Sequence, residues 1–165
     1  MCPIYRVHFI HIIDTDGVFI SEDCILEDNK CEYICYSENN IKYKNKQIVI
    51  DRNRKKASMI NKLLSTNSIW IDIPYSLYYM SCNLDCVLSG TYSNLSDKEK
   101  EDCAYNFVQK YIDDIPGFVD FINSKKISCS EKYKDSWDFI KRDNNSLKRL
   151  SNINTFINDK LKDKN

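Results

Sequence analysis

Histidine, glycine and proline are scarce in this chain, and no long apolar run occurs in it. Its 165 residues include two His, three Gly and three Pro. No segment approaches the ~18 consecutive apolar residues that a membrane-spanning helix needs. The N-terminal apolar stretch is interrupted by Arg6, His8 and His11, which is unlike a secretory signal. We therefore expect a cytoplasmic protein that has no membrane partner.

The chain also lacks net charge. It has 24 Lys and Arg residues against 24 Asp and Glu residues. This balance argues against a broad nucleic-acid-binding surface, although it leaves room for a local basic patch. A hydrophobic content of 42% in 165 residues is sufficient for a single folded domain with a buried core.

Cysteine pairs with the tight spacing of zinc knuckles are absent too. The eight cysteines form only two close pairs, Cys31-x3-Cys35 and Cys82-x3-Cys86, and both histidines lie far upstream of them. Zinc sites usually show C-x2-C spacing, often with His nearby. In a reducing compartment we expect free thiols packed in the interior, in preference to a zinc site.

The patterning predicts an α/β fold, with a small sheet, an inserted β-hairpin and a helical C-terminal half. Strands are expected at 4–13 and at 69–79, the second with a break at Pro74. Short strands at 31–36, 41–43 and 47–50 and a helix at 52–65 lie between them. Further helices are expected to begin at Ser96, Pro116 and Ser130, and to cover 145–162. We take 1–165 as one domain, with an α/β part at 4–88 and a helical part at 96–162.

The first predicted strand ends in Asp14-Thr15-Asp16-Gly17, which is the most informative motif in the chain. Strand side chains repeat every two residues, so both carboxylates would lie on one face at the mouth of the strand. Paired carboxylates are the hard oxygen ligands that Mg²⁺ prefers. The alternative is a strand-ending turn in which Asp14 makes a local hydrogen bond and Gly17 takes a positive φ.

A second acidic segment is expected at the same edge of the sheet. A strand–helix–strand unit favours a parallel pair, and ligands bind at the carboxyl ends of parallel strands. Asn83 follows the second predicted strand and can cap a short helix that carries Asp85. The sequence therefore predicts a site formed by Asp14, Asp16 and Asp85.

Other chemistry-bearing residues have weaker signals. The basic residues Arg52, Arg54, Lys55 and Lys56 could contact phosphates, although a solvated helical turn is the favoured alternative. Tyr75, Tyr78, Tyr79 and Trp70 could stack on bases, but aromatic residues in a strand more often pack in the core. His8 and His11 are three residues apart, so in a strand they point to opposite faces and cannot both reach the aspartates.

The segment from His11 to Gly17 resembles the second acidic motif of Toprim domains, the catalytic fold of topoisomerases, primases and OLD-type nucleases. The later strand and Ser81-x-Asn83-Leu84-Asp85 resemble the Toprim-like proteins of the RloB-like and abortive-infection group, found in bacterial and phage defence loci. The similarity covers about residues 4–88, and its motifs are short.

This resemblance implies Mg²⁺-dependent chemistry on nucleic-acid phosphodiesters. Asp14 and Asp16 would be the metal ligands, and Asp85 would be a third acidic group. The family pattern also has a general acid/base Glu on an earlier strand, and no such motif precedes Asp14 here. The loss of a proton-transfer group typically slows such a reaction by ~10²–10⁴-fold.

Three interpretations follow. The chain could be a defence-associated nuclease whose missing acid is supplied elsewhere. It could instead be a non-catalytic interaction protein, such as a phage or mobile-element inhibitor or a subunit, with a protein partner from a defence system. It could also be part of a longer or split gene product that carries the Glu motif.

Overall fold

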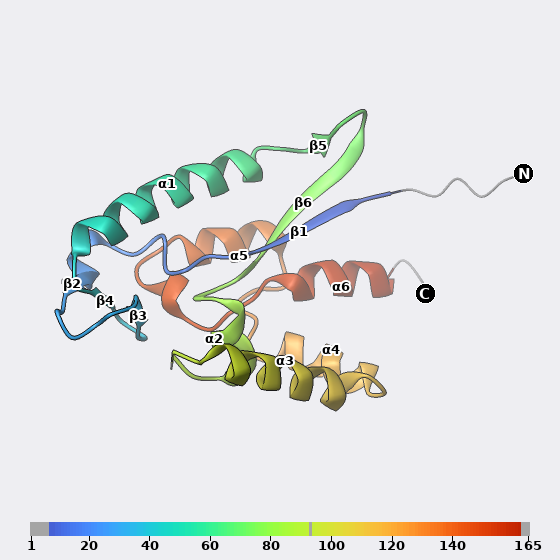
Figure 1. Ribbon diagram of the computed structural model, residues 1–165. Coiled ribbons are helices and arrows are strands. Elements are labelled where there is room, and N and C mark those ends of the chain that lie inside the picture. Colours follow the sequence, from blue (N-terminus) through green and yellow to red (C-terminus); the bar gives the residue numbers. More distant parts are fainter. Residues whose placement is uncertain (1–6, 93, 163–165) are drawn as a thin grey trace, which may run out of the picture.

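The computed structural model describes residues 7–92 and 94–162. The strands are β1 (Phe9–Asp14), β2 (Ile25–Glu27), β3 (Cys35–Tyr36), β4 (Ile41–Tyr43), β5 (Ser68–Ile69) and β6 (Ile73–Met80). The α-helices are α1 (Lys46–Leu64), α2 (Leu84–Ser89), α3 (Asp97–Tyr111), α4 (Ile115–Asn123), α5 (Tyr133–Ile140) and α6 (Ile153–Lys162). Figure 1 shows the predicted α/β organisation, with most helices in the C-terminal half.

The main sheet has the order β1-β6-β5. β1 and β6 are parallel, in a register that runs from Phe9 opposite Tyr75 to Asp14 opposite Met80. The long helix α1 lies between them in the sequence, so this unit is the strand–helix–strand arrangement that the pattern predicts (Figure 1). The carboxyl ends of both strands therefore lie side by side.

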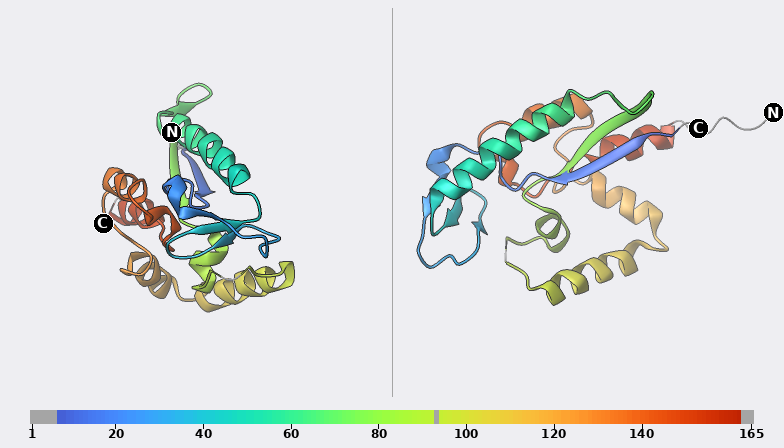
Figure 2. Two further views of the ribbon diagram at one scale, coloured as in Figure 1. Left: turned by 90° about the vertical axis from the view of Figure 1, so that its left-hand side faces the viewer. Right: turned by 45° about the horizontal axis from the view of Figure 1, so that its top comes forward.

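Helices cover both faces of the main sheet. On one face, alternate β6 residues pack against α1 and α5; this cluster includes Tyr75, Leu77, Tyr79, Ile60, Trp137 and Ile140. On the other face, Tyr78 packs against Ile122 of α4 and Ile153 of α6. Figure 2 shows α1 and α6 on opposite sides of the strands. The strand tyrosines are thus core residues, whereas Trp70 is 84% exposed at the turn before β6.

A second small sheet lies beside the N-terminal half of α1. β2 and β4 are parallel, and β3 and β4 form an antiparallel pair, so the predicted hairpin is present as part of a three-stranded sheet. Ile25 and Ile41 of this sheet pack against Val49 and Ile50 of α1. This cluster fixes the start of α1 relative to the turn that follows β1.

Several predicted boundaries are wrong. Residues 47–50 lie in the first turns of α1 and not in a strand, because Asn45 caps a helix that begins at Lys46, six residues before the predicted start at 52. The break before β6 falls at residues 70–72, where Trp70 and Asp72 have positive φ, and Pro74 lies inside β6. α5 begins at Tyr133, and the predicted helix at 145–162 is a 3-10 turn at Asn145–Leu147 followed by α6.

Two predicted helix starts are confirmed by their caps. Asn83 Oδ1 accepts a hydrogen bond from Cys86 N at the start of α2. Ser96 and Glu99 form the capping box of α3. The predicted strand at 4–13 is observed as Phe9–Asp14, and residues 4–6 lie outside the described residues.

Candidate functional site

The turn after β1 is fixed to the end of β6 by backbone hydrogen bonds. Thr15 N donates to Met80 O, and Asp16 N donates to Cys82 O. Asp16, Gly17 and Cys82 all have positive φ, so both strands end in left-handed turns that face each other. Asp14 and Asp16 therefore lie at the carboxyl edge of the sheet, next to the start of α2.

Residues from the end of the chain form the floor of this edge. Ser146 O accepts hydrogen bonds from Thr15 Oγ1, Ser81 Oγ and Cys82 N. Leu150 O accepts a hydrogen bond from Ser81 N. The sequence contains no motif that indicates this role for residues 146–150, because it depends on backbone carbonyls that any residue would supply.

Asp14 is held by the first residue of α2. Its Oδ1 accepts a hydrogen bond of 2.8 Å from Leu84 N. Burial raises the pKa of Asp14, and the negative charges of Asp16 and Asp85 raise it further, while the Leu84 hydrogen bond and Lys56 oppose the shift. The negative charges of Asp16 and Asp85 near Asp14 favour the approach of a cation to this edge.

Two basic residues of α1 reach this edge. Lys56 Nζ forms an ion pair with Asp16 Oδ2. Arg52 donates from Nη2 to Asp16 O at 2.9 Å and from Nη1 to Tyr36 OH at 2.9 Å. Their i,i+4 spacing places them on one face of the helix. Of the other two predicted basic residues, Arg54 pairs with Glu22 and Lys55 is exposed.

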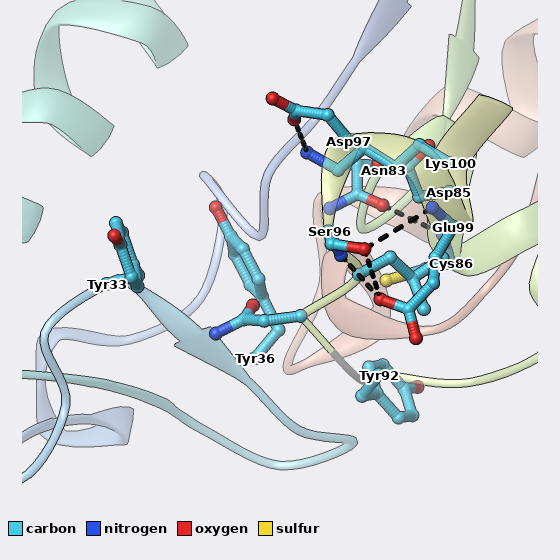
Figure 3. A pocket seen from close by; sticks show the side chains of 12 residues that line it. Tyr33, Tyr36, Asn83, Asp85, Cys86, Tyr92, Ser96, Asp97, Glu99 and Lys100 are labelled. Carbon is cyan, nitrogen blue, oxygen red and sulfur yellow. Dashed lines mark hydrogen bonds and ion pairs between the residues drawn. The ribbon is translucent and has the colours of Figure 1, made fainter.

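A pocket of about 750 Å³ opens beside the aspartates. Its walls include Tyr33, Tyr36, Asn83, Asp85, Tyr92 and Lys100. Figure 3 shows Tyr33 and Tyr36 on one side of the pocket, Asn83 and Asp85 on the opposite side, and Tyr92 near the base of the view. Because Asp85 follows Leu84 directly, the pocket and the Asp14 site share the first turn of α2.

Tyr36 connects the pocket to the basic side of the site. Its hydroxyl accepts the hydrogen bond from Arg52, and the guanidinium carbon lies 5.9 Å from the centre of the tyrosine ring. Burial raises the pKa of Tyr36 to about 12, and the positive charge of Arg52 opposes this shift. Tyr36 therefore stays protonated and neutral at neutral pH.

A pair of thiols lies at the start of α2. Cys82 Sγ donates to Cys86 Sγ at 3.0 Å, and both residues are buried. This hydrogen bond raises the pKa of the Cys82 thiol and lowers that of Cys86. The seven cysteines within the described residues are free thiols.

The side chains at this edge offer few oxygen ligands for a metal ion. Within residues 7–92 and 94–162, no three His, Cys, Asp or Glu side chains converge into a metal-binding group. Mg²⁺ keeps several waters and is often bound by only one or two carboxylates together with substrate phosphates. Asp14 and Asp16 fit that pattern, with Asp85 lying beside them as a pocket residue.

The histidines lie away from this site. His8 Nε2 is 2.9 Å from Ser76 Oγ, and His11 Nδ1 is 2.8 Å from Tyr75 OH. Sequence reasoning missed Tyr33, Tyr36 and Tyr92, because the segments that carry them are far apart in the chain. Only the accumulation of aromatic residues between Cys31 and Tyr36 could have indicated a surface of this kind.

No family model, curated protein or solved structure matches this chain. The Toprim resemblance therefore remains a prediction based on short motifs. None of the helices in the described part of the chain is both long and apolar enough to cross a bilayer.

Proposed function

We propose that this protein is a defence-associated, Toprim-like, Mg²⁺-dependent nuclease that cleaves phosphodiester bonds of nucleic acid. One observation supports this proposal. Two carboxylates and two cationic side chains lie together at the carboxyl edge of a parallel strand pair. Carboxylates that hold a divalent ion, and basic groups that neutralise phosphate charge, are the recurring parts of phosphoryl-transfer sites.

Each residue of the site would have a separate role in cleavage. Asp14 and Asp16 would hold Mg²⁺, which supplies a Lewis acid and lowers the pKa of bound water. Lys56, which pairs with Asp16, would help to neutralise the charge of a substrate phosphate at this edge. Arg52 is held by Tyr36 and by the Asp16 carbonyl, so its guanidinium is oriented before the substrate arrives.

One observation favours the alternative function. The ammonium group of Lys56 already lies on Asp16 and supplies the positive charge that a metal would otherwise provide. This ion pair fits a non-catalytic interaction protein that retains the architecture of the site.

Metal-dependent nicking distinguishes the two functions. Purified protein is incubated with plasmid and oligonucleotide substrates in Mg²⁺ or Mn²⁺, and its melting temperature is measured with and without the ion. We expect nicking and an ion-dependent rise in melting temperature, both lost in Asp14→Asn and Asp16→Asn. Asparagine at position 14 still accepts the hydrogen bond from Leu84 N, so the fold should be retained.

Asp138→Asn is the matched control, because Asp138 is an exposed acid on α5. It should behave like the wild type. If the wild-type protein does not nick with either ion, the nuclease proposal is wrong. If the ion also leaves the melting temperature unchanged, the interaction protein is the better description.

A further inference from the structure

We infer that the tyrosine-lined pocket beside Asp85 binds an unpaired base of a single-stranded nucleic acid. This inference deepens the proposed function by naming the substrate class, and it rests on that function only for the placement of the phosphate.

The walls of the pocket suit a planar aromatic ligand. Tyr33, Tyr36 and Tyr92 contribute three rings to a space of about 750 Å³. Tyr33 is 72% exposed, so it contributes little to the core, and its ring is free to be covered by a ligand. Tyrosine rings are common platforms for bases, and stacking is available only when a base is unpaired and turned outward.

Several polar groups of the pocket already have hydrogen-bond or ion-pair partners. Glu99 accepts hydrogen bonds from Ser96 N and Ser96 Oγ, and Asp97 lies 3.8 Å from Lys100. Asn83 Oδ1 accepts from Cys86 N. Asp85 is the acid that the first turn of α2 presents to the pocket without a role in capping.

A carboxylate in this position selects among bases. It accepts hydrogen bonds from the exocyclic amine of cytosine, adenine or guanine. Thymine and uracil have carbonyl oxygens on both sides of their single ring N–H, and these oxygens are repelled by a carboxylate. The pocket should therefore prefer amine-bearing bases to thymine or uracil.

The pocket lies next to the edge where the proposed function places the phosphate. Arg52 donates both to Tyr36 OH in the pocket wall and to Asp16 O at the sheet edge. On the opposite side, Leu84 N binds Asp14 while the next residue lines the pocket. A strand whose base enters the pocket would place its backbone toward Arg52 and Lys56, and away from the acidic wall.

The experiment is fluorescence anisotropy with labelled ten-nucleotide strands in EDTA at fixed salt. Omitting the metal separates binding from cleavage. The strands are oligo(dC), oligo(dT) and the duplex of oligo(dC) with oligo(dG). We expect the order oligo(dC), then oligo(dT), then duplex. Tyr33→Ala should weaken binding of oligo(dC) by about 5- to 150-fold, since base stacking on an aromatic ring contributes about 1–3 kcal/mol.

Tyr105→Ala is the matched control, because Tyr105 is 64% exposed on α3 and does not line the pocket. It should leave oligo(dC) binding unchanged. Asp85→Asn should reduce the preference for oligo(dC) over oligo(dT) while preserving the fold. Equal losses in the two tyrosine variants, equal binding of single strand and duplex, or no binding by any strand would overturn the inference.

The outcomes also separate this inference from the proposed function. Tyr33-dependent binding without nicking in Mg²⁺ or Mn²⁺ would support the pocket and refute the nuclease. Nicking that depends on Asp14, together with normal binding by Tyr33→Ala, would support the nuclease and refute the pocket.

Discussion

Replacement of Gly17 by alanine should destabilise the fold through two separate effects. Gly17 has a φ of +65°, a conformation that costs a residue with a Cβ about 1–2 kcal/mol. A Cβ at this position would also lie 2.5 Å from Leu147 Cδ2 and 2.9 Å from Ile41 Cδ1. Both of those side chains are fully buried, so they have no solvent into which to move.

Forcing an extra methyl group into such a core typically costs about 1–3 kcal/mol. Together with the backbone cost, Gly17→Ala should lose about 2–5 kcal/mol of the free energy of unfolding. For a chain of this size, this corresponds to a fall in melting temperature of about 4–20 °C. Thermal unfolding followed by circular dichroism measures the change.

Gly90→Ala provides the matched control. Gly90 has a φ of +77°, and a Cβ there would meet only Arg149 Nη1, at 3.1 Å, on a long side chain that can move. This variant should lose only the backbone contribution, about 1–2 kcal/mol. Equal losses in the two variants would refute the packing argument, and would leave Gly17 with a purely conformational role in the Asp-x-Asp-Gly turn.

Two further predictions concern pH and a buried amide. Burial raises the pKa of Asp14 above its usual 3.8, so the folded state binds the Asp14 proton more tightly than the unfolded chain does. The free energy of unfolding should therefore fall as the pH rises from 3.8 through the raised pKa. Asp14→Asn should remove this part of the slope in urea unfolding measured in EDTA as the pH rises above 3.8, and an unchanged slope would contradict the assignment. Asn152 accepts from Tyr79 N and donates to Ser136 Oγ, so Asn152→Ala should cost about 2–5 kcal/mol in urea unfolding. Asn158→Ala, at a surface amide pair with Asn123, should stay within about 0.5 kcal/mol, and similar losses in both variants would contradict the prediction.

The sequence was sufficient to predict the parts of the fold that depend on local patterns. The apolar run before Asp14 and the aromatic run before Ser81 identified the two parallel strands. The caps at Asn83 and Ser96 identified the starts of α2 and α3, because capping side chains act within three residues. The same reasoning placed the two acidic segments at one edge.

Other features depend on contacts that no local pattern records. The start of α1 was misplaced because Val49 and Ile50, read as strand residues, pack against the small sheet from a helix. Within the basic run, Arg52 and Lys56 are the residues that contact Asp16, and these contacts depend on the direction of the helix. The pocket was not predicted because its walls come from three segments that tertiary folding brings together.

The backbone carbonyls of Ser146 and Leu150, which form the floor of the aspartate edge, affect when this edge can form during translation. A chain emerging from the ribosome exposes Asp14, Asp16 and the end of β6 long before residues 146–150 are synthesised. Until then, Ser81 N, Cys82 N and Thr15 Oγ1 lack the carbonyl partners that they have in the finished protein. Domains are completed only when their distant segments arrive, so the aspartate edge should acquire its final shape late in translation.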